Sequence, residues 1–202
     1  MKKSLGWHLR RGIRSLGRRI ARMFYEQFGD VEKNLAPYAK AGGTRRLDLG
    51  CGTAIRNPFK AAEAYGVDIR LSNNEKIRCA DLSASDIPFP DEYFDFVSAF
   101  DFLEHVPRVS DAAGRRFPFV SLMNEIYRVL VPGGVFFCVT PAFPFSVAFR
   151  DPTHVNFITE ETFERYFDDK STLAAMYGFI GRFQLLKQGW RDGHLIVLLK
   201  KL

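Results

Sequence analysis

The sequence predicts an α/β fold in which a mostly parallel sheet ends in an antiparallel hairpin. Between residues 46 and 140, short apolar runs separated by turns alternate with helical patterns, which is typical of a parallel sheet. Near the C-terminus, two strand-like runs flank an Asp-Gly pair at positions 192–193, a strong hairpin signal. With 202 residues, 47% of them hydrophobic, the chain can bury one core without disulfides or metals. We therefore expect a single α/β domain at residues 41–202.

Seven segments have the apolar, turn-bounded pattern of strands. They are residues 46–49, 65–69, 77–80, 95–100, 135–140, 179–190 and 194–200. A helix is expected at residues 120–130, where apolar side chains recur at helical spacing. The Pro-Gly-Gly at residues 132–134 is interpreted as a turn before the fifth strand. Thr159, followed by two acidic residues, is expected to cap a second helix at residues 160–167.

Residues 1–40 form a distinct basic segment. Its first 25 residues carry eight Lys and Arg residues and no Asp or Glu. Its apolar residues recur on one helical face, at Leu5, Leu9, Ile13, Leu16, Ile20, Phe24 and Phe28. This pattern predicts a basic amphipathic helix. Three interpretations stay open: the helix packs on the body of the protein, it lies on an anionic membrane surface, or it is a transit peptide.

Charge and cysteine usage narrow the class of protein. Outside residues 1–25 the chain has 21 basic and 23 acidic residues, so the body gives no strong signal for nucleic-acid binding. Cys51, Cys79 and Cys138 lie far apart and form no Cys-x-x-Cys pair, which favours a reducing compartment. No run of about 18 apolar residues occurs. We expect a cytoplasmic protein, with contact to an anionic membrane surface through residues 1–25 as an option.

A glycine turn follows the first strand, where residues 47–54 read Leu-Asp-Leu-Gly-Cys-Gly-Thr-Ala. Its glycines place no side chain between the backbone and a ligand. Asp68 ends the second strand, at the position where a Rossmann-type fold binds ribose hydroxyls. Two further elements follow in order, Cys-Ala-Asp-Leu at residues 79–82 and the stretch from Asp91 to Val106. Four elements in this order are far more specific than any one of them.

Together these segments resemble the successive motifs of class I S-adenosylmethionine (SAM)-dependent methyltransferases, in particular the group that acts on small molecules and glycans. The resemblance covers residues of about 46–140. It implies a Rossmann-like fold with a seven-stranded, mostly parallel sheet, SAM as cofactor and S-adenosylhomocysteine as product. The cofactor site that it implies consists of Asp48, Gly50, Cys51, Gly52, Asp68, Ile69, Asp81, Leu82, Phe100 and Asp101.

The resemblance assigns roles within this site. The two glycines of the turn lie against the methionine part of SAM, and Asp48 orients the turn, with or without a bridging water. Asp68 holds the ribose hydroxyls, and Asp81 accepts a hydrogen bond from the adenine amino group. Leu82 stacks on the adenine ring. The two remaining residues of the set, after the fourth strand, line the amino-acid end of the cofactor.

The sequence departs from the family pattern in two places. Ala54 stands where a third glycine is usual, and the interval from Gly52 to Asp68 is short and interrupted by Asn57-Pro58. The helix after the first strand is therefore expected to be truncated or replaced by a loop. A dehydrogenase needs a helix there to bind a pyrophosphate, whereas SAM carries no phosphate. The departure therefore favours SAM over a dinucleotide.

The long connection at about residues 141–178 is expected to form the lid over the acceptor, because connections of this length are usually functional. Its Asp-Pro-Thr-His run at residues 151–154 is similar to that of methyltransferases acting on sugars and natural-product hydroxyls. His154 is the candidate base, with Asp151 orienting it; the alternative is a turn in which His154 caps the next helix. His105 is the second candidate, with a structural role in its own turn as the alternative.

We expect a SAM-dependent methyltransferase of a small molecule or glycan, acting at a hydroxyl oxygen. An RNA or protein methyltransferase anchored by the basic helix is one alternative, and a non-catalytic module that binds SAM or its product is the other. No Asn-Pro-Pro-Tyr motif follows the fourth strand, which disfavours methylation of adenine in nucleic acid. No metal-binding set is recognisable near the acceptor region, so no metal is expected, and the sequence leaves the oligomeric state open.

Overall fold

The computed structural model describes residues 27–38, 44–111 and 116–202. The predicted basic helix of residues 1–25 and the predicted domain boundary near residue 40 lie outside these residues. Among the described residues, no helix is long and apolar enough to cross a membrane.

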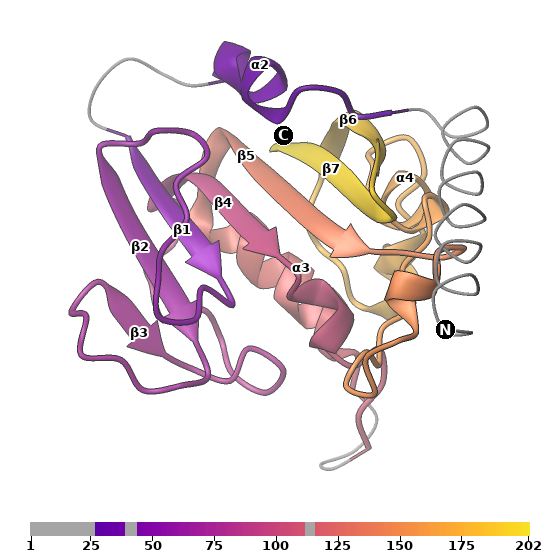
Figure 1. The fold of residues 1–202 in the computed structure, drawn as a ribbon, viewed down its shortest axis with the longest axis horizontal. Helices are drawn as coiled ribbons and strands as arrows, with labels where there is room; N and C mark the ends of the chain where they lie inside the picture. The colour runs from indigo at the N-terminus through magenta and orange to yellow at the C-terminus, as the bar shows by residue number, and fades with distance from the viewer. Residues whose placement is uncertain (1–26, 39–43, 112–115) are drawn as a thin grey trace, which may run out of the picture.

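A seven-stranded sheet forms the body of the protein, with the strand order β3-β2-β1-β4-β5-β7-β6 (Figure 1). The strands are β1 (Arg45–Leu49), β2 (Glu63–Asp68), β3 (Ile77–Cys79), β4 (Phe94–Phe100), β5 (Leu130–Pro141), β6 (Phe183–Arg191) and β7 (His194–Lys201). Neighbouring strands from β3 to β5 are parallel, whereas β7 pairs antiparallel with both β5 and β6. The predicted fold class, a mostly parallel seven-stranded sheet with a C-terminal antiparallel hairpin, is therefore confirmed.

Short helices complete the chain. They are α2 (Val31–Leu35), α3 (Pro118–Val129), α4 (Glu161–Tyr166) and the 3-10 turns η1 (Ala36–Tyr38), η2 (Leu103–His105), η3 (Ser146–Ala148) and η4 (Leu173–Tyr177). The expected cap of α4 differs, because the backbone nitrogen of Thr159 donates to Thr162 Oγ1 at 3.0 Å and no side chain caps the helix.

Two strands begin four or more residues away from their predicted starts. β5 begins at Leu130, directly after α3, so the Pro-Gly-Gly run lies inside the strand. Leu130 pairs with Phe94, and the register shifts before Phe96, which identifies an irregularity rather than a turn. β6 begins at Phe183 rather than at Phe179, whose ring packs at 5.0 Å from that of Phe167 in the core.

The two faces of the sheet are covered unequally. On one face, alternate strand residues such as Phe136 and Val197 pack with α3 and the lid in the larger core. On the other face, Phe137 and Ile196 join a smaller cluster that also contains residues from α2 and the loop after β1. Because both faces of the sheet are covered, successive residues of a strand are apolar on either face, and the strands appear as continuous apolar runs in the sequence.

The loop at residues 50–62 replaces the helix that would follow β1, as predicted. Its Phe59 is buried and stacks on Phe96 of β4, with ring centroids 4.2 Å apart. Asn57 braces the loop, since its side chain exchanges two hydrogen bonds of 3.0 Å with the backbone of Ala61. The smaller core is therefore covered at this point by one aromatic side chain instead of a helix.

Candidate functional site

The glycine turn at the end of β1 has a backbone shape that favours glycine. Gly50 and Gly52 both have a φ of +63°. A Cβ on Gly50 would lie 2.5 Å from the ring of Phe102, the residue that follows β4 by two positions. The turn is therefore packed directly against the start of the segment after β4, and its backbone faces the cavity described below.

Asp48 holds the loop that follows this turn from inside the sheet. Its buried carboxylate accepts hydrogen bonds from Ser98 Oγ at 2.8 Å and from the backbone nitrogen of Arg56 at 2.8 Å. Arg46, also buried, lies 3.3 Å away as its ion-pair partner. Burial raises the pKa of Asp48, and burial lowers the pKa of Arg46 to about 10, in both cases against the attraction of the pair. The bond from the backbone nitrogen of Arg56 ties the loop after the turn to Asp48.

Asp68 connects β2 to the glycine turn. Its Oδ2 accepts a hydrogen bond of 2.7 Å from the backbone nitrogen of Gly52. Its Oδ1 accepts from the backbone nitrogen of Arg70 at 3.0 Å and from Arg70 Nε at 2.8 Å. Burial favours the neutral acid, but these donors outweigh it and lower the pKa of Asp68. The side chain is thus an ionised acceptor at the edge of the cofactor cavity.

A cavity of about 320 Å³ lies at the carboxyl ends of β1, β2 and β4. Six of the ten residues predicted for the cofactor line it: Gly50, Asp68, Ile69, Asp81, Leu82 and Asp101. Gly52 and Cys51 belong to the turn beside it, and Asp48 lies behind that turn. Phe100 instead lines a second cavity of about 570 Å³, with Asn57 and His194. Sequence order alone does not separate these two cavities, because Asp101 borders both.

The residues of the first cavity fit SAM. The glycine turn offers open backbone, and Asp68 offers an ionised acceptor suited to ribose hydroxyls. Ile69 is 65% exposed and Leu82 is buried, so apolar side chains border the place expected for the adenine. Residues 53–62 form no helix whose N-terminus would bind a pyrophosphate, which fits a cofactor without phosphate.

His105 and His154 meet beside this cavity. Their rings pack edge to face with centroids 4.9 Å apart, and His105 also lines the cofactor cavity. The lid segment is tied to η2 by backbone hydrogen bonds of 2.9 Å, from the nitrogens of Val155 and Asn156 to the carbonyl of Glu104. Two candidates 49 positions apart in the sequence are therefore held as one histidine pair.

The carboxylate of Asp151 does not form the expected hydrogen bond with the His154 ring and instead contacts Thr153. Its Oδ1 accepts hydrogen bonds from Thr153, from the backbone nitrogen at 2.9 Å and from Oγ1 at 2.7 Å. Thr153 Oγ1 in turn lies 3.1 Å from His105 Nδ1. His154 Nδ1 instead lies 3.0 Å from the carbonyl oxygen of Ala148. Asp151 therefore acts on His105 through Thr153.

Glu104 is the functional candidate that sequence reasoning missed. It is 1% exposed, and its Oε2 accepts a hydrogen bond of 2.9 Å from Thr140. Its Oε1 is buried without a hydrogen-bond partner among the described residues. Burial raises the pKa of this carboxyl. In the sequence, the only hint of a role for Glu104 is that it directly precedes His105. His154 is brought close to Glu104 by backbone hydrogen bonds between distant segments, which the sequence does not reveal.

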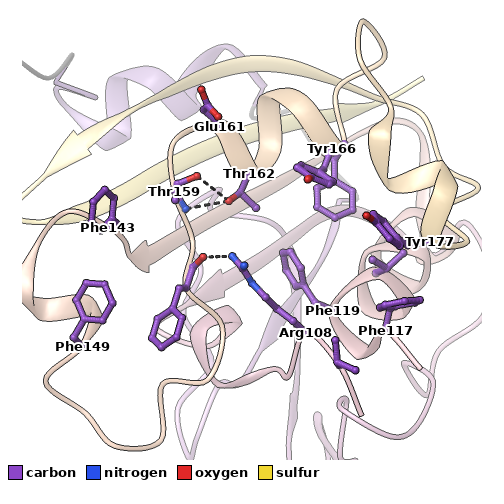
Figure 2. A pocket seen from close by; sticks show the side chains of 14 residues that line it. Arg108, Phe117, Phe119, Phe143, Phe149, Thr159, Glu161, Thr162, Tyr166 and Tyr177 are labelled. Carbon is purple, nitrogen blue, oxygen red and sulfur yellow. Dashed lines mark hydrogen bonds between the residues drawn. The ribbon is translucent and has the colours of Figure 1, made fainter. Parts of the chain in front are cut away.

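An aromatic cavity of about 640 Å³ is lined by the lid and by the segment after η2 (Figure 2). The segment after η2 joins the two regions, since Val106 lines the cofactor cavity and Arg108 lines the aromatic one. The lid contributes Phe143, Phe149 and Phe157, which are 52%, 51% and 46% exposed. The opposite wall consists of Phe117, Phe119, Tyr166, Phe167 and Tyr177.

Arg108 is the basic residue of this cavity. In Figure 2 it lies between the two aromatic walls. Its Nε donates to Asn156 Oδ1 at 2.8 Å, and its Nη2 donates to the carbonyl oxygen of Phe157. Burial lowers the pKa of Arg108. The guanidinium both fixes the lid and places a positive charge in a mostly aromatic cavity, whose other polar lining residues include Thr159, Glu161 and Thr162.

The parallel sheet with its antiparallel end, the glycine turn and Asp68 define a class I SAM-dependent methyltransferase. Residues 9–170 match the family described as a methyltransferase domain, and the chain belongs to that family. Structural comparison agrees on the fold: a SAM-dependent methyltransferase from Mesorhizobium loti has a TM-score of 0.55 at 17% identity, covering 86% of this chain and 99% of that one.

Curated relatives match part of the chain. The demethylmenaquinone methyltransferase of Listeria welshimeri is 32% identical over 120 residues, which cover 50% of this chain and 47% of that protein. The ubiquinone/menaquinone biosynthesis C-methyltransferase UbiE of Rickettsia bellii is 31% identical over 111 residues, which cover 55% of this chain and 40% of that protein. The chain thus spans about half the length of these relatives or less.

Proposed function

We propose that this protein transfers the methyl group of SAM to a small, ring-shaped acceptor that carries a hydroxyl. The observation that carries the proposal is the aromatic cavity, which is joined to the cofactor cavity by the segment after η2 and is lined by lid residues on both sides of His154 in the sequence. SAM supplies a methyl group on a sulfonium, which is already electrophilic. The protein has to align the acceptor with that methyl group, exclude water and ionise the hydroxyl.

The aromatic cavity favours a flat, apolar acceptor. Phe149 and Phe157 stack at 5.2 Å with their planes 29° apart, and Phe143 packs edge-on against Phe149 at 6.4 Å. Half-exposed phenylalanines in a group are unusual on a protein surface and typical of a binding site. Arg108 gives this cavity one cation for a carbonyl or phenolate oxygen of the acceptor.

The two relatives named above support a ring-shaped acceptor, since their names refer to quinones. Loss of the proton from a ring hydroxyl makes both the oxygen and the neighbouring ring carbons nucleophilic. The same histidine pair therefore suits methylation at the hydroxyl oxygen, which we propose, and methylation at carbon, which the name of UbiE states for that protein. A glycan hydroxyl, suggested by residues 151–154, remains the other acceptor class to test.

The test supplies the purified protein with SAM labelled in its methyl group and, separately, with hydroquinones, simple phenols and oligosaccharides. We expect label in the ring-shaped acceptors, and NMR of the product then locates the methyl group on oxygen or carbon. Label in the oligosaccharides alone would overturn the acceptor class. The His154→Ala variant should lose turnover while isothermal titration shows unchanged SAM affinity. Turnover that survives this change would overturn the role of the pair.

We also propose that the basic segment of residues 1–25 brings the protein to an anionic membrane surface, where apolar acceptors are found. Its eight positive charges without an acidic residue support this. Flotation with vesicles of anionic lipid should carry the full chain, whereas deletion of residues 1–25 should abolish flotation and leave SAM affinity unchanged. Equal flotation of both forms would contradict the proposal.

A further inference from the structure

We propose that Glu104, His105 and His154 bind a divalent transition-metal cation beside the cofactor cavity. The potential ligand atoms of these three residues lie within 4.8 Å of one another. They come from two segments, since Glu104 and His105 belong to η2 and His154 belongs to the lid. Two histidines and one carboxylate that converge in this way form a recurrent ligand set for divalent metals.

The hydrogen bonds of the two histidines involve Nδ1 and so place the lone pair of each ring on Nε2. The carbonyl oxygen of Ala148 only accepts, so His154 Nδ1, 3.0 Å away, carries the proton. The carbonyl oxygen of Thr153 lies 3.3 Å from His105 Nδ1 and likewise only accepts. Thr153 Oγ1 donates to Asp151 and therefore also accepts from His105. Both Nε2 atoms keep a lone pair, as ligands held by an outer carbonyl or carboxylate do.

Glu104 provides an independent observation. A carboxylate oxygen that is buried without a partner is costly, because nothing replaces the water that it has lost. Thr140 holds Oε2, while Oε1 has no hydrogen-bond partner among the described residues. A cation between Glu104 and the two imidazoles would satisfy this oxygen. A bound cation would therefore explain both the buried Glu104 oxygen without a partner in the described part of the chain and the convergence of the three potential ligands.

The ligand set indicates which cations fit. Imidazole nitrogens favour Zn²⁺, Co²⁺ and similar ions over Mg²⁺ and Ca²⁺, which prefer oxygen ligands. With metal–ligand bonds of about 2.0–2.2 Å, opposite ligand atoms lie at most about 4.4 Å apart. The observed spread of up to 4.8 Å is therefore closed by small side-chain rotations. Three protein ligands also leave at least one position for a water or an acceptor oxygen.

The catalytic use of this ion rests on the proposed function. An acceptor hydroxyl that occupies the open position would ionise more readily, because a bound cation lowers the pKa of a coordinated oxygen. The ion would thus perform the activation that we place at the histidine pair. The site itself needs no acceptor, and binding of the metal alone can be measured.

The test uses the full chain, freed of metal with a chelator and titrated with Co²⁺, whose visible absorption reports nitrogen and oxygen coordination. Zn²⁺ and Mg²⁺ are titrated by calorimetry. We expect stoichiometric Co²⁺ and Zn²⁺ binding, weak or absent Mg²⁺ binding, and a loss of affinity of at least about tenfold in Glu104→Gln and in His154→Asn. His194→Asn, a histidine outside the cluster, should bind as the unchanged protein does.

SAM titration of the same samples separates the possible failures. Variants that keep SAM affinity and melting temperature but lose Co²⁺ establish the site. Absence of Co²⁺ and Zn²⁺ binding, or binding that survives both substitutions, overturns the metal site and leaves the methyltransferase proposal standing. Preference for Mg²⁺ over Zn²⁺ overturns the assigned class of cation. If the unchanged protein does not bind SAM, the proposed function itself is overturned.

Discussion

The backbone nitrogen of Gly52 donates a 2.7 Å hydrogen bond to Asp68 Oδ2, so the acidic end of β2 holds the glycine turn of β1. One carboxylate therefore serves both the shape of the turn and the expected contact with the ribose. We predict that Asp68→Ala weakens SAM binding at least about tenfold, because an ionised acceptor and a fixed turn are lost together. Isothermal titration with SAM and S-adenosylhomocysteine measures this.

The control for this prediction is Asp86→Ala. Asp86 is an exposed acidic residue in the loop after β3, outside the cofactor cavity. Its replacement should leave the affinity unchanged. Equal affinities of the Asp68 variant and the unchanged protein would show that SAM does not use this carboxylate.

Gly50→Ala should destabilise the fold more than Gly178→Ala does. Both glycines have positive φ, +63° and +91°, so each alanine incurs backbone strain of about 1–2 kcal/mol. A Cβ at position 50 would in addition lie 2.5 Å from the Phe102 ring, whereas a Cβ at position 178 meets no atom within 4 Å. Urea denaturation should give the larger loss of unfolding free energy for the first variant. Equal losses would mean that Phe102 moves aside without cost.

The sequence was sufficient to predict the sheet because its strands are buried on both faces or pair locally. Parallel strands of this kind appear in the sequence as apolar runs, and the Asp-Gly pair at residues 192–193 predicts the final hairpin. The boundaries of β5 and β6 were wrong by a few residues. Leu130 continues the chain from helix to strand without a turn signal, and Phe179 is apolar because it packs in the core rather than in a strand.

The site was less predictable, because its key contacts are long-range. Asp68 and the glycine turn follow from local pattern, and so do the two histidines as candidates. Their meeting depends on two backbone hydrogen bonds between Glu104 and the lid, which no local pattern encodes. For the same reason the sequence alone did not suggest the proposed metal site, although Glu104, His105 and His154 all lie in segments that it singled out.

Thr153→Val should weaken metal binding about tenfold or more, because it removes the hydroxyl between His105 and Asp151. The hydroxyl donates to Asp151 at 2.7 Å and lies 3.1 Å from His105 Nδ1, so it orients the imidazole. Thr153→Ser keeps the hydroxyl and should keep the affinity. Co²⁺ titration of both variants measures the effect. Equal weakening in both would show that the methyl group of Thr153, not its hydroxyl, supports the site.

The ion pair between His194 and Asp101 should make stability depend on pH near neutrality. His194 Nε2 lies 3.2 Å from Asp101 Oδ1. The carboxylate raises the pKa of His194 above 6.5 against the effect of burial, and the imidazole lowers the pKa of Asp101 below 3.8. His194 contributes fully to the stability of the fold below the pKa that it has in the unfolded chain. This contribution is lost as the pH rises through its raised pKa in the folded protein. That of Asp101 is lost only as the pH falls through its lowered value.

The pair is therefore at full strength between the two unfolded pKa values and weakens on the alkaline side first. Urea midpoints of the unchanged protein and His194→Asn, measured from about pH 5.5 to about pH 8.5, should converge as the pH rises. Arg56 and His154 also act on Asp101, and Glu104 acts on His194, so the partner must be tested directly. In an Asp101→Asn background, His194→Asn should produce no pH-dependent difference. A difference that persists there would assign the effect to Glu104 instead of Asp101.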